Sequence, residues 1–499
     1  MTTASTPAAI ADRAAARSVS AIALNQIAQV VGSILFVAQV PRSLGPDIYG
    51  QLAFAFALIT ILQMIGELGY QEIFSRFLPE VRQREGEAGV RAMVRGLFTV
   101  RVAVGLSLGV LALVSARLAA PWLTLLQAAL IALSVMARVW SMGPFPLLLG
   151  LGQTYKWSVE TTWRQIVITG LVLLIVRAPS LTLALLAMAI HEVVFLLLGL
   201  WWVRGWIFPR KLEASSKTLR VEEDGSSAAI PASSLLRFGF LFSLANLALV
   251  VLFRISPLAV KWLTGSHSQT GFFDLALGGL LLIYTLLGQV AYAFVPILTQ
   301  LYLAQQSAEA DVWLGRVARY STMLVALAVG GMWAVATPMA PLLFGQDFAP
   351  AAETQRMMAL ALLPLPVAWA GVTLTAVERR PRRKLWAALA GMAVFGVAAV
   401  ALRGAQSPGI ALAFGLAMLG YAAGFGRSAA HAVRAGGLSW GLALAGTALF
   451  APLFFTRFTS LPVALGAWFG LACVYVAVML FARVARPAEL RTFLSALRR

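Results

Sequence analysis

Apolar stretches of roughly 20 residues recur along the whole chain, and short polar gaps separate them. Each stretch is long enough to cross a hydrocarbon core of about 30 Å as a helix that rises about 1.5 Å per residue. The stretches lack the strict apolar–polar alternation of membrane β-strands. Because helices and closed barrels are the only structures that span lipid, the pattern predicts an all-α protein that crosses the membrane many times.

The predicted spans can be placed in the sequence from these stretches. We expect about fourteen, at residues 18–40, 50–78, 90–114, 118–144, 155–176, 180–204, 236–263, 271–303, 316–338, 352–377, 385–402, 408–432, 438–455 and 461–481. The eleventh and thirteenth are the shortest and only just reach across. Because the number is even, both chain ends are expected on one side of the membrane.

Positive charge gathers in every second gap, and this predicts the orientation. Most of the 39 Lys and Arg residues lie in a few gaps, at 76–95, 204–237, 379–384 and after 483. The gaps with little charge are 41–49, 264–270 and 344–350. Since basic residues concentrate on the cytoplasmic side, we expect the first set and both termini to be cytoplasmic.

The gaps also suggest how the chain is divided. We expect a lead-in at 1–17, a first lobe at 18–205, a polar linker at 206–235, a second lobe at 236–434, two more spans at 435–483 and an amphipathic tail at 484–499. A faint repeat supports two lobes of six helices each, since the segment 45–50 corresponds to 265–273 and Phe-Leu-Pro at 77–79 to Phe-Val-Pro at 294–296. Parallel repeats of this kind hold a substrate between the two halves.

Composition excludes several functional classes. The chain is 60% hydrophobic and 12% charged, with a net charge of +19. This charge is scattered over short loops, which argues against nucleic-acid binding and favours attraction to anionic membrane lipids. The single cysteine, Cys473, rules out a disulfide or a cysteine-based metal site within one chain. There is no Gly-rich phosphate loop, so we expect neither ATP hydrolysis nor a cofactor.

Five segments carry a resemblance to a known family. They are RSLGPDIYG at 42–50, ELG at 67–69, RFLPE at 76–80, LGLGQ at 149–153 and LLFGQDFAPA at 342–351. In this order and spacing they resemble the bacterial polysaccharide exporters. These are lipid-linked oligosaccharide flippases of the O-antigen type, within the multidrug/oligosaccharidyl-lipid/polysaccharide (MOP) superfamily. The resemblance covers about residues 25–376, and the last four spans agree mainly in number.

The resemblance implies a two-lobed transporter with two helices appended, in the bacterial cytoplasmic membrane. Such a protein takes a polyprenyl-diphosphate-linked oligosaccharide from the inner to the outer leaflet by alternating access. The implied partners are this lipid-linked glycan, membrane lipids, an H⁺ or Na⁺ counter-ion, and a polysaccharide polymerase or glycosyltransferases. The related extruders of organic cations are the main alternative, and a membrane enzyme is a weaker one because the outer loops are short.

Three arginines inside predicted spans are the candidate substrate contacts, because charge inside a bilayer is costly and usually faces a cavity. A diphosphate suits the planar donor fork of arginine. Arg138 is near the inner end of span four, so it can also reach water from there. Arg164 has Glu160 four residues earlier, so the two can form a neutral pair on one helix face that still lines the cavity. Arg254 lies in the outer half of span seven, where Asp274 is a possible partner.

Further polar residues complete the prediction. Arg101 is expected to meet Glu67 and form a cytoplasmic funnel that attracts an anionic head group.

His191 and Glu192 lie near the middle of span six, and either can bind a proton in a coupled cycle. We also include Asp274 among the candidates for ion coupling. A Glu192 neutralised by a neighbouring helix is the alternative. Asn25 and Gln29 share one face of span one, where they either contact sugar hydroxyls or bridge helices.

Overall fold

A computed structural model describes residues 38–67, 69–151, 154–207, 232–292, 298, 301, 304–378 and 380–485. All regular elements in these ranges are helical, which confirms the predicted all-α class. The lead-in, most of the linker, most of the tail, Asn25 and Gln29 lie outside the described residues. Grouping by contacts divides the chain into two units: 1–44 with 55–247, and 45–54 with 248–499.

Ten helices within the described ranges are long and apolar enough to span a membrane, and a bent pair, Ala351–Leu362 with Leu365–Thr375, makes eleven. The ten are Ala38–Ile65, Glu85–Ala119, Leu125–Leu148, Leu181–Ile207, Ser243–Thr264, His267–Gly288, Ala308–Phe344, Arg382–Ala401, Arg403–Gly424 and Leu461–Phe481. Two shorter apolar helices, Ile166–Arg177 and Gly441–Phe455, fall in predicted spans five and thirteen. Most of predicted span one precedes the described residues.

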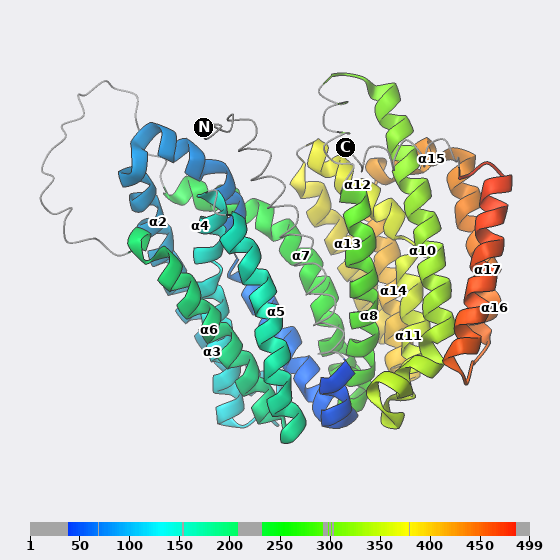
Figure 1. The fold of residues 1–499 in the computed structure, drawn as a ribbon, viewed down its shortest axis with the longest axis horizontal. Coiled ribbons are helices and arrows are strands. Elements are labelled where there is room, and N and C mark those ends of the chain that lie inside the picture. Colours follow the sequence, from blue (N-terminus) through cyan, green and yellow to red (C-terminus); the bar gives the residue numbers. More distant parts are fainter. Residues whose placement is uncertain are drawn as a thin grey trace, which may run out of the picture. The chain divides into compact units, whose positions relative to one another are not determined.

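Five complete helices belong to the first unit (Figure 1). They are α2 (Tyr70–Ala119), α3 (Leu125–Ser141), α4 (Pro144–Gly150), α5 (Thr154–Arg177) and α6 (Leu181–Ile207). Helix α3 packs on α2 and on α6, and α5 packs on α6 and α4. Thr124 starts α3 with a capping box, in which Thr124 and Gln127 satisfy each other's backbone N–H groups.

The second predicted span ends earlier than its hydropathy suggested. The helix Ala38–Ile65 stops there, and α2 begins five residues later at Tyr70. Gly69 is left-handed, with φ 67° and ψ 30°, so the chain turns between these two helices. The turn contains Gly66, Glu67 and Gly69, and apolar residues resume at Ile73 and Phe74, so a span drawn from hydropathy ran through the break. Helix α2 is itself kinked at Gly86.

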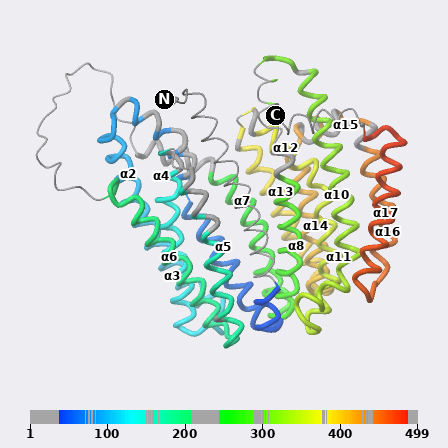
Figure 2. Tube along the Cα trace, viewed as in Figure 1, coloured from blue at the N-terminus to red at the C-terminus, as the bar shows by residue number. Residues whose placement is uncertain are grey.

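The remaining helices belong to the second unit, except that α7 (Ala232–Thr264) contributes residues to both. They are α8 (His267–Tyr292), α10 (Ser307–Phe344), α11 (Ala351–Ala359), α12 (Leu365–Val377), α13 (Pro381–Ala401), α14 (Gln406–Gly424), α15 (Arg427–Ala445), α16 (Ala451–Phe455) and α17 (Leu461–Phe481). In Figure 2 the long helices of this unit lie side by side. Helix α14 packs on α13 and α11, and α10 packs on α15, α11 and α17.

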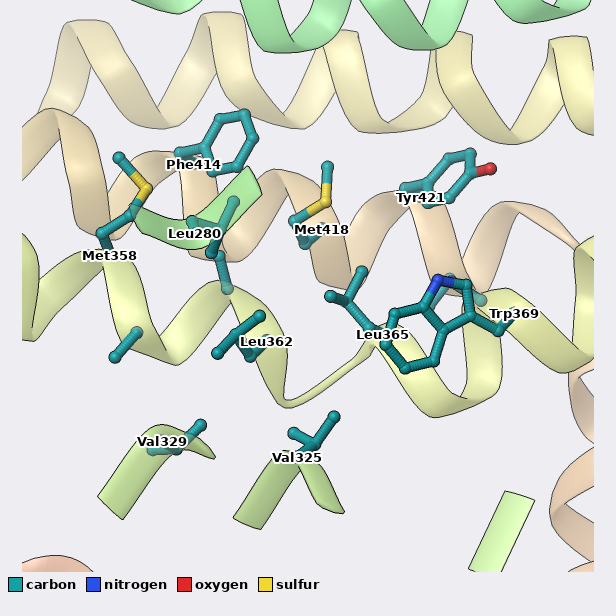
Figure 3. Close-up of a cluster of buried hydrophobic side chains, with 14 of the residues drawn as sticks. Leu280, Val325, Val329, Met358, Leu362, Leu365, Trp369, Phe414, Met418 and Tyr421 are labelled. Carbon is teal, nitrogen blue, oxygen red and sulfur yellow. The ribbon is translucent and has the colours of Figure 1, made fainter. Parts of the chain in front are cut away.

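The core of the second unit explains this packing (Figure 3). Phe414, Met418 and Tyr421 follow one face of α14 at helical spacing, and all three are nearly fully buried. Leu362 and Trp369 belong to the same buried cluster. They flank the 45° bend between α11 and α12, where Pro364 and Pro366 prevent a continuous helix.

Candidate functional site

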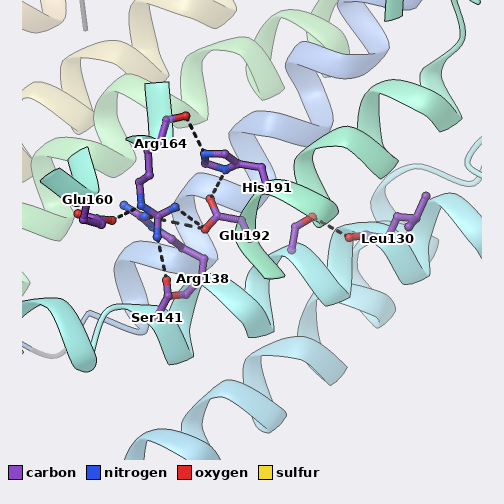
Figure 4. Close-up of polar contacts among 8 residues, drawn as sticks. Leu130, Arg138, Ser141, Glu160, Arg164, His191 and Glu192 are labelled. Atoms are coloured by element: carbon purple, nitrogen blue, oxygen red, sulfur yellow. Dashed lines mark hydrogen bonds and ion pairs between the residues drawn. The ribbon is translucent and has the colours of Figure 1, made fainter. Parts of the chain in front are cut away.

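Three helices of the first unit bring six polar side chains together (Figure 4). We call this group the polar centre; it consists of Arg138 and Ser141 on α3, Glu160 and Arg164 on α5, and His191 and Glu192 on α6. All of its charged residues were predicted from the sequence. The packing of α3 and α5 against α6 is what joins them into one group.

Arg164 is the hub of the polar centre. Its Nε donates to Glu160 Oε1 on its own helix, so the predicted pair four residues apart is present. Its Nη1 donates to Glu192 Oε2 at 2.8 Å, and its Nη2 donates to Ser141 Oγ at 3.1 Å. The guanidinium also lies 4.6 Å from the centre of the Phe195 ring. Charge, hydrogen bonds and an aromatic face therefore all hold this one cation in place.

Arg138 is held less tightly. Its Nη1 lies 3.8 Å from Glu192 Oε2, the same oxygen that accepts from Arg164. The Arg138 side chain is 29% exposed, compared with 12% for Arg164 and 13% for Glu192. Glu192 is therefore shared by two arginines, and Arg138 is the more accessible of the two.

His191 faces two acceptors. Its Nε2 lies 3.2 Å from the carbonyl oxygen of Arg164, and its Nδ1 lies 3.4 Å from Glu192 Oε1. A backbone carbonyl can only accept a hydrogen bond, and so can an ionised carboxylate. A neutral imidazole carries one N–H and satisfies only one of these contacts, whereas the imidazolium satisfies both.

The charges of the polar centre cancel. Two guanidinium groups face two carboxylates, and the cluster is neutral when His191 is neutral. Buried charge in lipid is tolerated where it is paired in this way, and removing one member of a pair leaves the other charge uncompensated. An incoming anion would therefore have to compete with Glu192 and Glu160 for the same donors.

Arg101 lies elsewhere in the first unit and is 1% exposed. Its Nε donates to the carbonyl oxygen of Val139 at 2.6 Å, and its Nη2 donates to that of Gly66 at 3.0 Å. Both carbonyls lie where helices end, and a cation there satisfies acceptors that the helix leaves open. The guanidinium also stacks 3.7 Å from the centre of the Tyr70 ring. Glu67, the predicted partner of Arg101 in a funnel, is half-buried next to Gly66.

The predicted partnership between Arg254 and Asp274 is present in the second unit. Arg254 Nη1 on α7 lies 3.9 Å from Asp274 Oδ1 on α8, and both side chains are mostly buried. Tyr49 donates its hydroxyl to Asp274 Oδ2 at 2.8 Å. The sequence analysis did not single out Tyr49, although it lies in one of the segments that carry the family resemblance.

Two buried arginines among the described residues were missed, Arg319 on α10, which is 7% exposed, and Arg356 on α11. Arg356 on α11 is 2% exposed; its Nη1 donates to the carbonyl of Phe454 at 2.6 Å, and its Nη2 to Thr337 Oγ1 at 2.9 Å and to the carbonyl of Thr456. These contacts fasten the end of α16 to α10 and α11. The one sequence signal for Arg356 was a charge inside predicted span ten, close to the predicted outer end of that span. Within the described ranges, no group of three or more His, Cys, Asp or Glu side chains is placed to hold a metal ion.

Comparisons with solved structures show the fold. The lipid II flippase MurJ, in an inward closed conformation, matches with a TM-score of 0.65 and 11% identity, over 93% of this chain and 100% of that protein. An inward-facing multidrug resistance MATE transporter of the MOP superfamily matches with a TM-score of 0.62 and 14% identity, over 80% and 95%. A MOP superfamily transporter from Pyrococcus furiosus matches with a TM-score of 0.54 and 14% identity, over 87% and 96%.

Sequence comparison shows the family. No curated protein sequence matches the chain. A profile of the family described as polysaccharide biosynthesis protein matches residues 15–302, which is more than half of the sequence. The chain therefore belongs to the polysaccharide biosynthesis protein family, and its fold is similar to that of solved transporters of the MOP superfamily.

Proposed function

We propose that this transporter moves a polyprenyl-diphosphate-linked oligosaccharide from the inner to the outer leaflet of the bacterial cytoplasmic membrane. Three features support the proposal: the family membership, the fold shared with a lipid II flippase, and buried arginines on several spans. In this proposal both termini are cytoplasmic, and the transported glycan serves assembly of a surface polysaccharide.

The observation that carries the proposal is the accessibility of Arg138 within the polar centre. A diphosphate needs cationic donors along a path that is otherwise apolar, and arginine presents them as a planar fork. Arg138 meets its carboxylate only at 3.8 Å and keeps 29% of its side chain exposed. We assign Arg138 the first contact with the diphosphate. Arg164 is the second donor, and it becomes available when phosphate oxygens replace Glu192.

Variants of these two arginines test the proposal. Arg138→Ala should reduce glycan export in a complemented flippase-null strain at least tenfold at unchanged protein level, and Arg138→Lys should retain part of it. Arg177→Ala is the matched control, because Arg177 is an exposed arginine in the last turn of α5. Full export by Arg138→Ala, by Arg164→Ala and by the double variant would contradict the cationic assignment.

Extrusion of organic cations is the second candidate function, and the buried carboxylates favour it. Glu160 is buried and Glu192 is mostly buried in the polar centre, and the fold also matches a multidrug transporter. The same strains separate the two functions. A cation extruder would not restore glycan export in the flippase-null strain and would lose drug resistance in Glu192→Gln. A flippase would restore export and lose it in the arginine variants.

A further inference from the structure

A short, strongly basic segment joins α12 to α13. Residues 378–384 contain five Lys or Arg side chains and a single carboxylate, that of Glu378, so the segment carries a net charge of +4. The charge pattern assigns this segment to the cytoplasmic side of the membrane. No acidic residue follows within the sequence of α13, so the helix itself does not offset the positive charge at its start.

Two arginines of this segment differ in how firmly they are held. Arg383 is fixed, because its Nη1 donates to Glu378 Oε2 at 2.5 Å and to Ser428 Oγ at 3.0 Å. Since Ser428 lies in the first turn of α15, this side chain joins the starts of α13 and α15. Arg380 is held loosely, because its Nε lies 3.9 Å from Glu378 Oε2 and its side chain is 62% exposed. The carboxylate is therefore engaged by Arg383, and Arg380 is accessible to an anion from outside the protein.

An exposed stripe runs along α13 from this basic end. Each residue turns a helix by about 100°, so residues three or four positions apart lie on one side. The exposed positions at this spacing form a continuous line: Arg382, Trp386, Leu389, Ala393, Val397 and Val400. The opposite side of α13 packs on α14, and Ala388, Phe395 and Ala399 are buried there. The stripe therefore faces lipid, with an arginine at one end and apolar side chains along the rest.

The order of residues along the stripe fits an anionic amphiphile. One half of the hydrocarbon core is about 15 Å thick, and about ten residues of helix cover it. Tryptophan is typical of the level where hydrocarbon meets headgroups, and Trp386 is 65% exposed. Arg382 lies one turn nearer the start of the helix, and therefore at the level of the headgroups. Val397, which is 76% exposed, lies about one leaflet deeper than Trp386.

We propose that the start of α13 binds one anionic phospholipid of the cytoplasmic leaflet. Arg380 and Arg382 bind the phosphate, to whose oxygens the planar fork of arginine is suited. The ring of Trp386 lies against the glycerol region, and one acyl chain follows the stripe past Leu389 to Val397. The stripe lies on the unpacked side of its helix, where membrane phospholipids are the surrounding solvent. Neither the lipid nor its contacts depend on which substrate the protein moves.

A localised lipid site differs from the general attraction of a basic surface to anionic lipid. General attraction depends on the total charge, so every exposed arginine on the cytoplasmic side contributes alike. A site depends on particular residues. Arg95 provides the comparison, because it is an exposed arginine in the helix Glu85–Ala119, near the end that the charge pattern assigns to the cytoplasm. Four residues further on, that helix has Thr99 where the stripe on α13 has Trp386.

Lipid binding to the purified full-length chain tests the site. Native mass spectrometry in a non-ionic detergent counts the lipids retained during titration with phosphatidylglycerol, or with phosphatidylcholine that has the same acyl chains. We expect the wild type to bind the first phosphatidylglycerol at least tenfold more tightly than phosphatidylcholine. The double variant Arg380→Gln/Arg382→Gln should lose this preference, at about fivefold in affinity for each cation removed. Lysine at both positions should retain most of it, and Arg95→Gln should leave it unchanged.

A photoreactive lipid locates the site. Phosphatidylglycerol with a diazirine on one acyl chain should label peptides of α13 in the wild type. Trp386→Leu keeps an apolar side chain but removes the interfacial ring, and it should reduce this labelling severalfold. Equal affinities of the arginine double variant and of Arg95→Gln for phosphatidylglycerol would overturn the site and leave only diffuse attraction. Labelling spread evenly over the spans would overturn it as well.

Discussion

Replacing Glu192 by glutamine tests whether the polar centre is an anion site. Glutamine keeps the size of the side chain and one oxygen acceptor but removes the negative charge. Arg164 then keeps Glu160 as its remaining carboxylate, and Arg138 loses the carboxylate that lies 3.8 Å away. The net charge of the centre changes from zero to +1 when His191 is neutral.

The expected changes in stability and in anion affinity follow from the geometry. Opposite charges about 4 Å apart attract by about 4 kcal/mol at an effective dielectric constant of 20. Removing one partner of a buried ion pair costs about 3–5 kcal/mol, and a retained hydrogen bond inside a membrane protein returns about 0.6–1.7 kcal/mol. We expect Glu192→Gln to lower the free energy of unfolding by about 2–4 kcal/mol. The uncompensated cation should tighten binding of an anion at least tenfold, which is about 1.4 kcal/mol.

Two measurements on purified protein check both numbers. Reversible unfolding in mixed micelles gives the change in stability, and titration with inorganic pyrophosphate at low and high salt gives the change in affinity. Glu87→Gln is the matched control, because Glu87 pairs with Arg82 at 2.7 Å on the surface and 44% of its side chain is exposed. An exposed pair contributes at most about 1 kcal/mol.

The reasoning is refuted if Glu192→Gln destabilises the protein but leaves pyrophosphate affinity unchanged. The polar centre would then be a structural ion pair that no diphosphate reaches. A tighter pyrophosphate affinity that is lost at high salt would support the electrostatic argument.

Two other predictions test a close backbone contact and the orientation. Gly50→Ala places a Cβ against the carbonyl of His267 at the start of α8 and should lower the free energy of unfolding by about 1–3 kcal/mol. The control Gly278→Ala lies on an open face of α8 and should raise it by about 0.5–1 kcal/mol. Equal stabilities of the two variants would contradict the close contact. In a cysteine-free background, Asp347→Cys should react with a membrane-impermeant maleimide in intact cells and Arg82→Cys only after lysis; the reverse pattern would overturn the predicted orientation.

The site was predicted in parts, and those parts were local. The pair of Glu160 and Arg164 follows from a separation of four residues on one helix, and the structure confirms it. That Glu192 joins this pair and also faces Arg138 depends on which sides of α3, α5 and α6 meet. Hydropathy does not contain this information, because in lipid the apolar residues of a span point in every direction.

Glycine gave the weakest sequence signals and some of the most specific contacts. The motif at 45–50 indicated a family and a turn, but it did not indicate that Gly50 meets His267 about two hundred residues later. Arg356 was missed for a similar reason. Its partners include the carbonyls of Phe454 and Thr456, and a backbone carbonyl leaves no mark in the sequence.

The sequence by itself determined that this is a helical protein with many spans, and it placed most of those spans. The physical reason is that lipid forces each backbone segment to satisfy its own hydrogen bonds, so length and hydropathy are sufficient. Tertiary structure alone decided which buried charges share a partner and which glycines meet. Those contacts depend on helix packing, where shape and a few polar groups select the neighbours while hydrophobicity is nearly uniform.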